Sequence, residues 1–207
     1  IRCSRAVLSA PLIVVGVLGL SACSALGPEA SAHPPVAIAR DHLQGFALTG
    51  RFALRQEGKN YPGRLYWRHD GDRDELLLSS PLGQGLAEIV SDATGARLTG
   101  SDGKSHTAAT ADQLLQSLLA YPLPLSRLPD WLRGCNPDNG DMALDTLGRP
   151  LRLRHEDWLI HYEYDSDDPQ ALPNRLFVER EGGLELRLRI EEWQMLPTAL
   201  PAKSCTQ

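Results

Sequence analysis

The residue types that usually carry catalysis or bind metals are present in this chain, but their spacing fits no reaction centre. His155-Glu156 begins like the zinc-binding pattern of a metalloprotease, yet the residue four positions after His155 is Leu159. The segment Gly100-Ser-Asp-Gly103 lacks the spacing of a nucleophile elbow and is typical of a turn. Neither Asp138-Asn-Gly-Asp141 nor Asp165-Ser-Asp-Asp168 completes a calcium-binding loop. We therefore expect no catalytic residue, no metal site and no cofactor.

One cysteine stands at a position where a known covalent modification occurs. Arg2 and Arg5 flank the start of an uncharged run, residues 6–20, which is shorter than the ~20 residues that span a bilayer and suits a secretory signal. The run ends in Leu20-Ser-Ala-Cys23, which resembles the lipobox of bacterial lipoproteins, where the cysteine thiol receives a diacylglyceryl group. We expect residues 1–22 to be a signal peptide and Cys23 to be the lipid attachment site.

The segment after Cys23 is small, polar and proline-containing. Residues 23–35 are therefore predicted to form a lipidated tether, and Ser24, where an Asp would favour the inner membrane, points to the outer membrane. Cys135 and Cys205 remain, and an oxidising periplasm permits a disulfide between them. The sequence leaves their pairing open.

The composition is that of an ordinary globular protein. Of the 207 residues, 42% are hydrophobic and 23% are charged, and the net charge of −5 argues against nucleic acid as a partner. No repeat or second domain is visible. Residues 36–195 are predicted to form one domain, and residues 196–207 a disordered tail.

Segments in which apolar and polar residues alternate, separated by turn-forming residues, dominate the domain. Leu184–Ile190 is apolar at every second position, which is typical of an antiparallel strand with one wet face. Trp193 falls out of phase with this strand, so Glu191-Glu192 is predicted to be a bulge or the strand's end.

The strand pattern is interrupted once, by two short helices. A capping box at Thr110–Gln113 begins the first, and the second, 127–133, ends at Gly134. We predict six strands, this helical pair as a cover over one mouth of a curved sheet, and four more strands.

The aromatic residues and one leucine allow two interpretations each. Trp158, Ile160, Tyr162 and Tyr164 share one strand face, which suits either a filled core or a lined hollow, and periodicity cannot separate the two. The turn 79–85 carries Leu82 at its tip, where polar residues are usual; the leucine either folds back onto the sheet or protrudes.

A set of short motifs follows in order along the chain. They are Leu48-Thr-Gly-Arg51, Leu65-Tyr-Trp67, Leu76–Gly83, Leu123-Pro-Leu125, Trp131-Leu-Arg-Gly134, Gly148-Arg149, Trp158, Tyr162, Leu172-Pro173 and Trp193. Together with the lipobox, this ordered set resembles the LolB family of outer-membrane lipoproteins. No single motif is specific, whereas their order over nearly the whole chain is.

The resemblance implies a mainly β fold: a half-open antiparallel β-barrel of about eleven strands, with helices lidding the concave face. It implies a receptor that accepts acylated lipoproteins from the periplasmic carrier LolA in an apolar cavity. The receptor then inserts them into the outer membrane without nucleotide. It is not an enzyme, and it acts as a monomer anchored through Cys23 on the periplasmic face.

The resemblance also implies site residues. The membrane-insertion loop would be Pro81, Leu82 and Gly83, with Leu82 protruding. The residues that line the acyl-chain cavity would be Trp67, Trp131, Trp158, Tyr162 and Trp193.

Two other functions remain open from the residues. A lipid-scavenging lipoprotein of the same architecture would need the cavity but not an inserting leucine. A small hydrolase would need a cluster of polar, titratable groups inside the cavity.

Overall fold

The computed structural model describes residues 43–118, 123–136, 140–181 and 183–196. The chain divides into two compact units, 1–32 and 33–207, and every described residue lies in the second. Within the described ranges, no helix is both long enough and apolar enough to cross a membrane.

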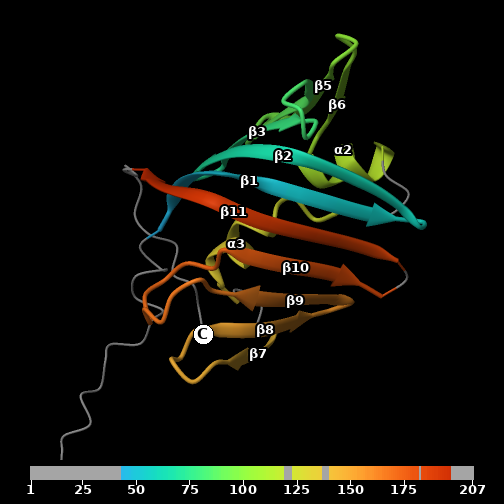
Figure 1. Cartoon of the computed structure of the whole chain (residues 1–207). Coiled ribbons are helices and arrows are strands. Elements are labelled where there is room, and N and C mark those ends of the chain that lie inside the picture. Colours follow the sequence, from blue (N-terminus) through green and yellow to red (C-terminus); the bar gives the residue numbers. More distant parts are fainter. Residues whose placement is uncertain (1–42, 119–122, 137–139, 182, 197–207) are drawn as a thin grey trace, which may run out of the picture. The chain divides into compact units, whose positions relative to one another are not determined.

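Eleven antiparallel strands form one curved sheet (Figure 1). The strands are β1 (Gly45–Gln56), β2 (Lys59–Asp70), β3 (Arg73–Ser79), β4 (Gly85–Asp92), β5 (Gly95–Gly100), β6 (Ser105–Ala108), β7 (Asp141–Leu144), β8 (Pro150–His155), β9 (Trp158–Glu163), β10 (Arg175–Arg180) and β11 (Leu184–Leu196). Their order is β6-β5-β4-β3-β2-β1-β11-β10-β9-β8-β7, so β6 and β7 are edges and the sheet does not close. The prediction of a mainly β, half-open architecture with about eleven strands is confirmed.

The first and last strands meet in the middle of the sheet. β1 pairs with β11 from Gly45↔Leu196 to Gln56↔Leu184, with one shift in register after Thr49. The shift leaves Glu191 as an extra residue, which is the predicted bulge, and it returns Trp193 to the inner face opposite Leu48. Gly50 is required there, since a Cβ would lie 2.4 Å from the carbonyl oxygen of Arg189.

Two helices connect β6 to β7 and lie on the same side of the sheet (Figure 1). Helix α2 (Ala111–Leu118) begins after Thr110, whose hydroxyl accepts a hydrogen bond from the Gln113 amide at 3.2 Å. Helix α3 (Leu128–Arg133) ends at Gly134 in the left-handed conformation, with φ of +71°. Both predicted helices are therefore present, within one residue of their expected limits.

The strand count after the helices differs from the prediction, which had four strands where the structure has five. The strand that was not predicted is β7, whose four residues are too few for alternation to be recognised; β6 is equally short. Their shortness suits their position, because a short edge strand offers little template for pairing with another chain.

The two ends of the sheet differ. The turns β1–β2, β3–β4, β5–β6, β8–β9 and β10–β11 all lie at one end, which we call the hairpin end. The opposite end carries the start of β1, the end of β11 and the remaining turns. The described chain therefore enters the sheet, at Gly45, at the end away from the β3–β4 turn.

A buried arginine organises the turn between β7 and β8. The Arg149 side chain donates from Nε to Asp145 at 2.8 Å and from Nη1 to the Ser166 carbonyl at 2.7 Å, and it lies 4.0 Å from the centroid of the Tyr164 ring. Burial raises the pKa of Asp145, but hydrogen bonds from Arg149 and from the Leu147 amide outweigh it and hold the pKa below its usual range.

Asp145 should therefore contribute stability that depends on pH. Its folded pKa is depressed, so the contribution is complete above the unfolded value of about 3.9 and is lost as the pH falls through the folded pKa. Asp145→Asn should lower the free energy of unfolding at pH 7 by about 1–3 kcal/mol, and by less at pH 3. Urea unfolding at both pH values measures this, with Asp165→Asn, an exposed partner of Arg175, as the near-neutral control. An equal loss at both pH values would contradict the assignment.

Candidate functional site

An apolar cavity of about 220 Å³ lies between the sheet and the two helices. Every residue that lines it has a hydrocarbon or indole side chain. The lining residues are Phe52, Leu54, Leu65, Trp67, Leu76, Leu78, Ile89, Leu98, Leu115, Leu118, Leu123, Leu125, Leu128, Leu132, Leu176, Val178, Leu186 and Leu188. A site of this kind can hold hydrocarbon, and its lining offers no group that could act as an acid, base or nucleophile.

Strand and helix periodicity place these side chains. Phe52 and Leu54 lie two residues apart on β1 and so share the inner face, as do the equivalent pairs on β2, β3 and β11. Leu128 and Leu132 lie four residues apart on α3 and face the same way. The helical pair thus covers the concave face, as predicted.

The more exposed part of the cavity wall lies toward the hairpin end, and we infer that the mouth of the cavity lies there. Its deeper wall is closed, with Leu76 and Ile89 only 5% and 3% exposed. Leu54, Leu78 and Leu98 are half-buried and lie nearer the hairpin end of their strands. The rim on the helix side is Leu118, which is 40% exposed at the last turn of α2.

The floor of the cavity is aromatic and hydrogen-bonded. Trp67 donates from Nε1 to Asp74 Oδ1 at 2.8 Å, and the same oxygen lies 2.8 Å from His69 Nδ1. The Phe46 ring packs between Trp67 and Trp193, at centroid distances of 5.9 and 5.3 Å. This fixes the indole of Trp67 and closes the end opposite the mouth.

Of the five aromatic residues predicted for the cavity, Trp67 lies on its wall and the other four lie elsewhere in the core. Trp131 of α3 packs against Trp158 of β9, with ring centroids 5.6 Å apart. Tyr162 is 2% exposed on the inner face of β9, and Trp193 donates from Nε1 to the Pro173 carbonyl at 3.1 Å. The wall leucines were not in the predicted set, although alternation along the strands marks them as inward-facing.

The β3–β4 turn presents a leucine to solvent. The Gly83 amide donates to the Ser80 carbonyl at 2.9 Å, and the Ser80 amide donates to the Gln84 carbonyl at 2.7 Å, leaving a three-residue loop. Pro81 suits the first corner of this turn because its φ is fixed, and Gly83 supplies a φ of +87°. Leu82, at the tip, is 91% exposed, so the leucine protrudes from the sheet rather than folding back.

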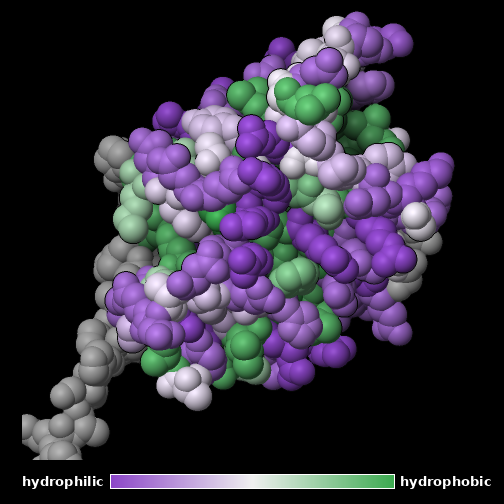
Figure 2. All heavy atoms as spheres, viewed as in Figure 1, coloured by the Kyte–Doolittle hydropathy of each residue, from purple (hydrophilic) through white to green (hydrophobic). Residues whose placement is uncertain are grey.

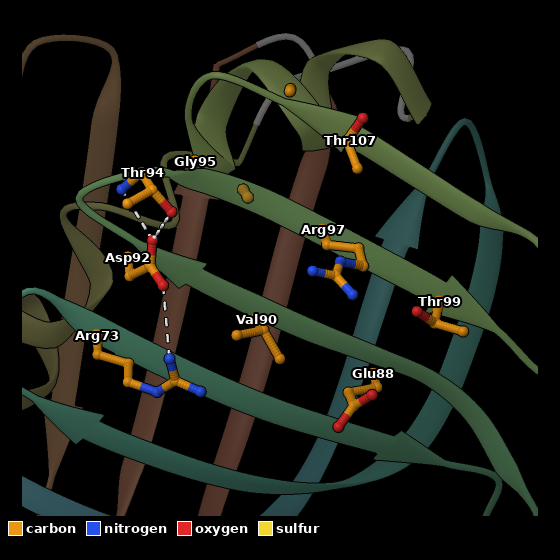
Figure 3. Close-up of a pocket in the computed structure, with 11 residues that line it drawn as sticks. Arg73, Glu88, Val90, Asp92, Thr94, Gly95, Arg97, Thr99 and Thr107 are labelled. Atoms are coloured by element: carbon orange, nitrogen blue, oxygen red, sulfur yellow. Dashed lines mark hydrogen bonds and ion pairs between the residues drawn. The ribbon is translucent and has the colours of Figure 1, made fainter.

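A second, polar groove of about 440 Å³ lies on the outer face of β3–β6 (Figure 3). Its charged groups are largely paired: Arg73 contacts Glu75 and Asp92, and Asp92 accepts two hydrogen bonds from Thr94. The hydrogen bond to Glu75 is the main cause that raises the pKa of Arg73. The hydrogen bonds from Thr94 are the main cause that lowers the pKa of Asp92. The surrounding outer face is mostly hydrophilic (Figure 2), which suits solvent contact rather than acyl binding.

Two further predictions concern cysteines and metals. Cys23 lies outside the described residues. Cys135 is 2% exposed and disulfide-bonded, and its partner also lies outside the described residues. Among the residues that the structure describes, no group of three or more His, Cys, Asp or Glu is placed to hold a metal ion.

Comparison with known proteins gives a consistent result. Residues 44–193 match the family model described as outer membrane lipoprotein LolB. The chain is 41% identical over 179 residues to the outer-membrane lipoprotein LolB of Dechloromonas aromatica, covering 84% of this chain and 94% of the relative. It is 35% identical over 197 residues to that of Azoarcus sp., covering 94% and 99%, and 36% identical over 182 residues to that of Thiobacillus denitrificans, covering 86% and 93%.

Filling the mouth of the cavity should abolish its capacity for hydrocarbon. Leu54→Trp places an indole where the wall is half-buried, so the affinity for a fluorescent single-chain fatty acid should fall at least about tenfold. Stability should change by less than about 1.5 kcal/mol, because the mouth has room for the larger side chain. Leu151→Trp, at an exposed position of β8 that does not line the cavity, is the matched control and should bind normally. Equal fatty-acid binding by both variants would show that the cavity is not the binding site.

Proposed function

The chain belongs to the LolB family of outer-membrane lipoproteins, and we propose that it receives acylated lipoproteins from the periplasmic carrier LolA and inserts them into the outer membrane. The observation that carries the proposal is the location of two features at one end of the sheet. The apolar cavity opens there, and Leu82 projects into solvent there with 91% of its surface exposed.

The energetics of the cargo explain why such a cavity is needed. A triacylated lipoprotein carries on the order of 45 methylene groups at about 0.8 kcal/mol each, so exposing its chains to water costs some tens of kcal/mol. A carrier and a receiver must therefore both shield the chains. Transfer needs no nucleotide if the receiver buries the acyl chains better than the carrier does and the bilayer buries them best.

The cavity must widen to take the cargo. A cavity of about 150 Å³ holds one benzene molecule, so one of about 220 Å³ is too small for three acyl chains. The two covering helices are held differently. Arg133 of α3 is 6% exposed and donates from Nη1 to the Leu43 carbonyl at 2.8 Å, which ties α3 to the start of β1.

Helix α2 packs on the core through Leu114 and Leu115, and it is the part that we propose moves, because its side-chain hydrogen bonds to the neighbouring segment are exposed. Its Asp112 accepts hydrogen bonds from the amide and hydroxyl of Ser126, at 3.0 and 2.5 Å, and these are exposed. Its last turn forms the rim of the mouth through Leu118. Displacing α2 would therefore enlarge the cavity from the mouth inward while α3 and the floor stay in place.

Leu82 provides contact with the bilayer rather than anchorage. Full burial of a leucine gains about 1.5–3 kcal/mol, which orients the mouth toward the membrane without holding the protein there. Attachment is the role that we propose for the lipid on Cys23, with residues 24–35 as the tether. The chain would act as a monomer on the periplasmic face.

Leu82→Glu should separate delivery from folding and from cargo binding. The side chain is almost fully exposed, so the free energy of unfolding should stay within about 0.5 kcal/mol of the original chain. The protein should still accept radiolabelled lipoprotein from the loaded carrier, but transfer onward to outer-membrane vesicles should fall at least about tenfold. Leu82→Ile should transfer normally. Normal transfer by Leu82→Glu would exclude the insertion role and favour a lipid-scavenging lipoprotein.

A further inference from the structure

We propose that the membrane-contacting element is the whole tip of the β3–β4 hairpin, in which Leu86 inserts beside Leu82 and Glu88 limits the depth. This inference rests on the proposed insertion function and extends it, because it adds an inserting residue and defines a boundary. The hairpin tip is taken here as residues 79–86.

The hairpin tip lies in the middle of an uncharged segment. Residues 76–87, with the sequence LLLSSPLGQGLA, contain no Asp, Glu, Lys or Arg, although the chain average of 23% charged residues would give about three. Three of its leucines are exposed: Leu82 by 91%, Leu77 by 48% and Leu86 by 43%. An uncharged tip can enter the headgroup region without moving a charge out of water.

A bulge directs Leu86 outward. Leu78 pairs with Ala87 and Ser79 pairs with Gly85, so Leu86 is the extra residue on β4. Its carbonyl oxygen accepts a hydrogen bond from the Ser101 amide at 2.9 Å, which holds this part of β4 against the β5–β6 turn. Gly85 beside it has open space where a Cβ would lie, so nothing at that position covers the leucine.

The strand register then determines how deep each residue of the hairpin would lie in the membrane. Leu86 is two positions from Gln84 at the base of the loop, which is about 7 Å along the strand. Interfacial elements bury their apolar side chains about 5–10 Å into the headgroup and acyl boundary, so Leu86 lies within that range and Leu77 lies at its limit. Leu77 pairs with Glu88, the first charged residue on β4 beyond the tip, and a carboxylate at that level resists deeper entry.

The outer face beside the tip also suits a lipid surface. Arg64 of β2 pairs with Ser79 and is exposed, so its guanidinium group lies at the level where headgroup phosphates would be. The occupant that fits an uncharged tip with exposed leucines and a flanking cation is therefore a phospholipid surface. A protein partner on the same leucines is the competing occupant, and the experiment separates the two.

The test compares Leu86→Glu with Leu151→Glu, a leucine of similar exposure on β8 that is likewise the extra residue at a register shift. Binding to vesicles of phosphatidylethanolamine and phosphatidylglycerol is measured by co-sedimentation, using the full chain with Cys23→Ala. Leu86→Glu should bind at least about fivefold more weakly than the parent, and Leu151→Glu should bind equally well. Thermal unfolding checks that both variants are folded.

A second measurement reads depth. An environment-sensitive fluorophore attached to Leu82→Cys or Leu86→Cys should shift to the blue when vesicles are added, whereas one attached to Glu88→Cys or Leu151→Cys should not. A shift at position 88 as large as that at 86 would overturn the proposed boundary.

The outcomes distinguish this inference from the function on which it rests. If Leu82→Glu abolishes vesicle binding while Leu86→Glu binds normally, the insertion role stands and the role of Leu86 is wrong. If neither substitution affects binding, both are wrong. If Leu86→Glu binds vesicles normally but no longer accepts cargo from the loaded carrier, a protein partner occupies this surface and the lipid assignment is overturned.

Discussion

An unfilled apolar space inside a folded protein forfeits packing contacts, and much of this structure serves to keep such a space from collapsing. The walls are held from outside the cavity. The long β1–β11 and β1–β2 pairings form the middle of the sheet, and the side chain of Asp74 holds the Trp67 indole at the floor. The wall residues on the sheet cannot close the space themselves, because they extend from strands whose register is fixed by backbone hydrogen bonds.

The two helices that cover the cavity, α3 and α2, are attached to the rest of the fold in different ways. Arg133 is buried and donates to the Leu43 and Pro129 carbonyls as well as contacting Asp130. Pro129 and Asp130 belong to α3 itself, so displacing α3 from the sheet would break the bond to Leu43 and expose the buried side chains of α3. Helix α2 also buries Leu114 and Leu115, but its Asp112–Ser126 contacts are exposed and can be exchanged for water at little cost. In the proposed opening, the helix whose polar contacts are exposed is the one that is displaced.

Sequence reasoning recovered the features whose cause is local. The clean alternation of Leu184–Ile190 identified its strand, the Trp193 phase break identified the bulge, and Gly134 marked the end of α3. β7 was missed because four residues carry too little period, and the eleven-strand total came from the family resemblance. Strand alternation shows that a leucine faces inward, but it does not show whether the leucine packs against a neighbour or faces an empty space. The cavity wall was therefore assigned to aromatic residues, and of these Trp67 alone lines the cavity.

In the proposed function, the aromatic floor and a mouth on the side of Leu82 mean that acyl chains leave by the opening through which they enter. An incoming molecule then cannot push an earlier one out from behind. A carrier docked at that opening would also stand in front of Leu82. Loading and unloading would then be successive steps that exclude each other, and the departure of the empty carrier would be the event that permits contact with the bilayer.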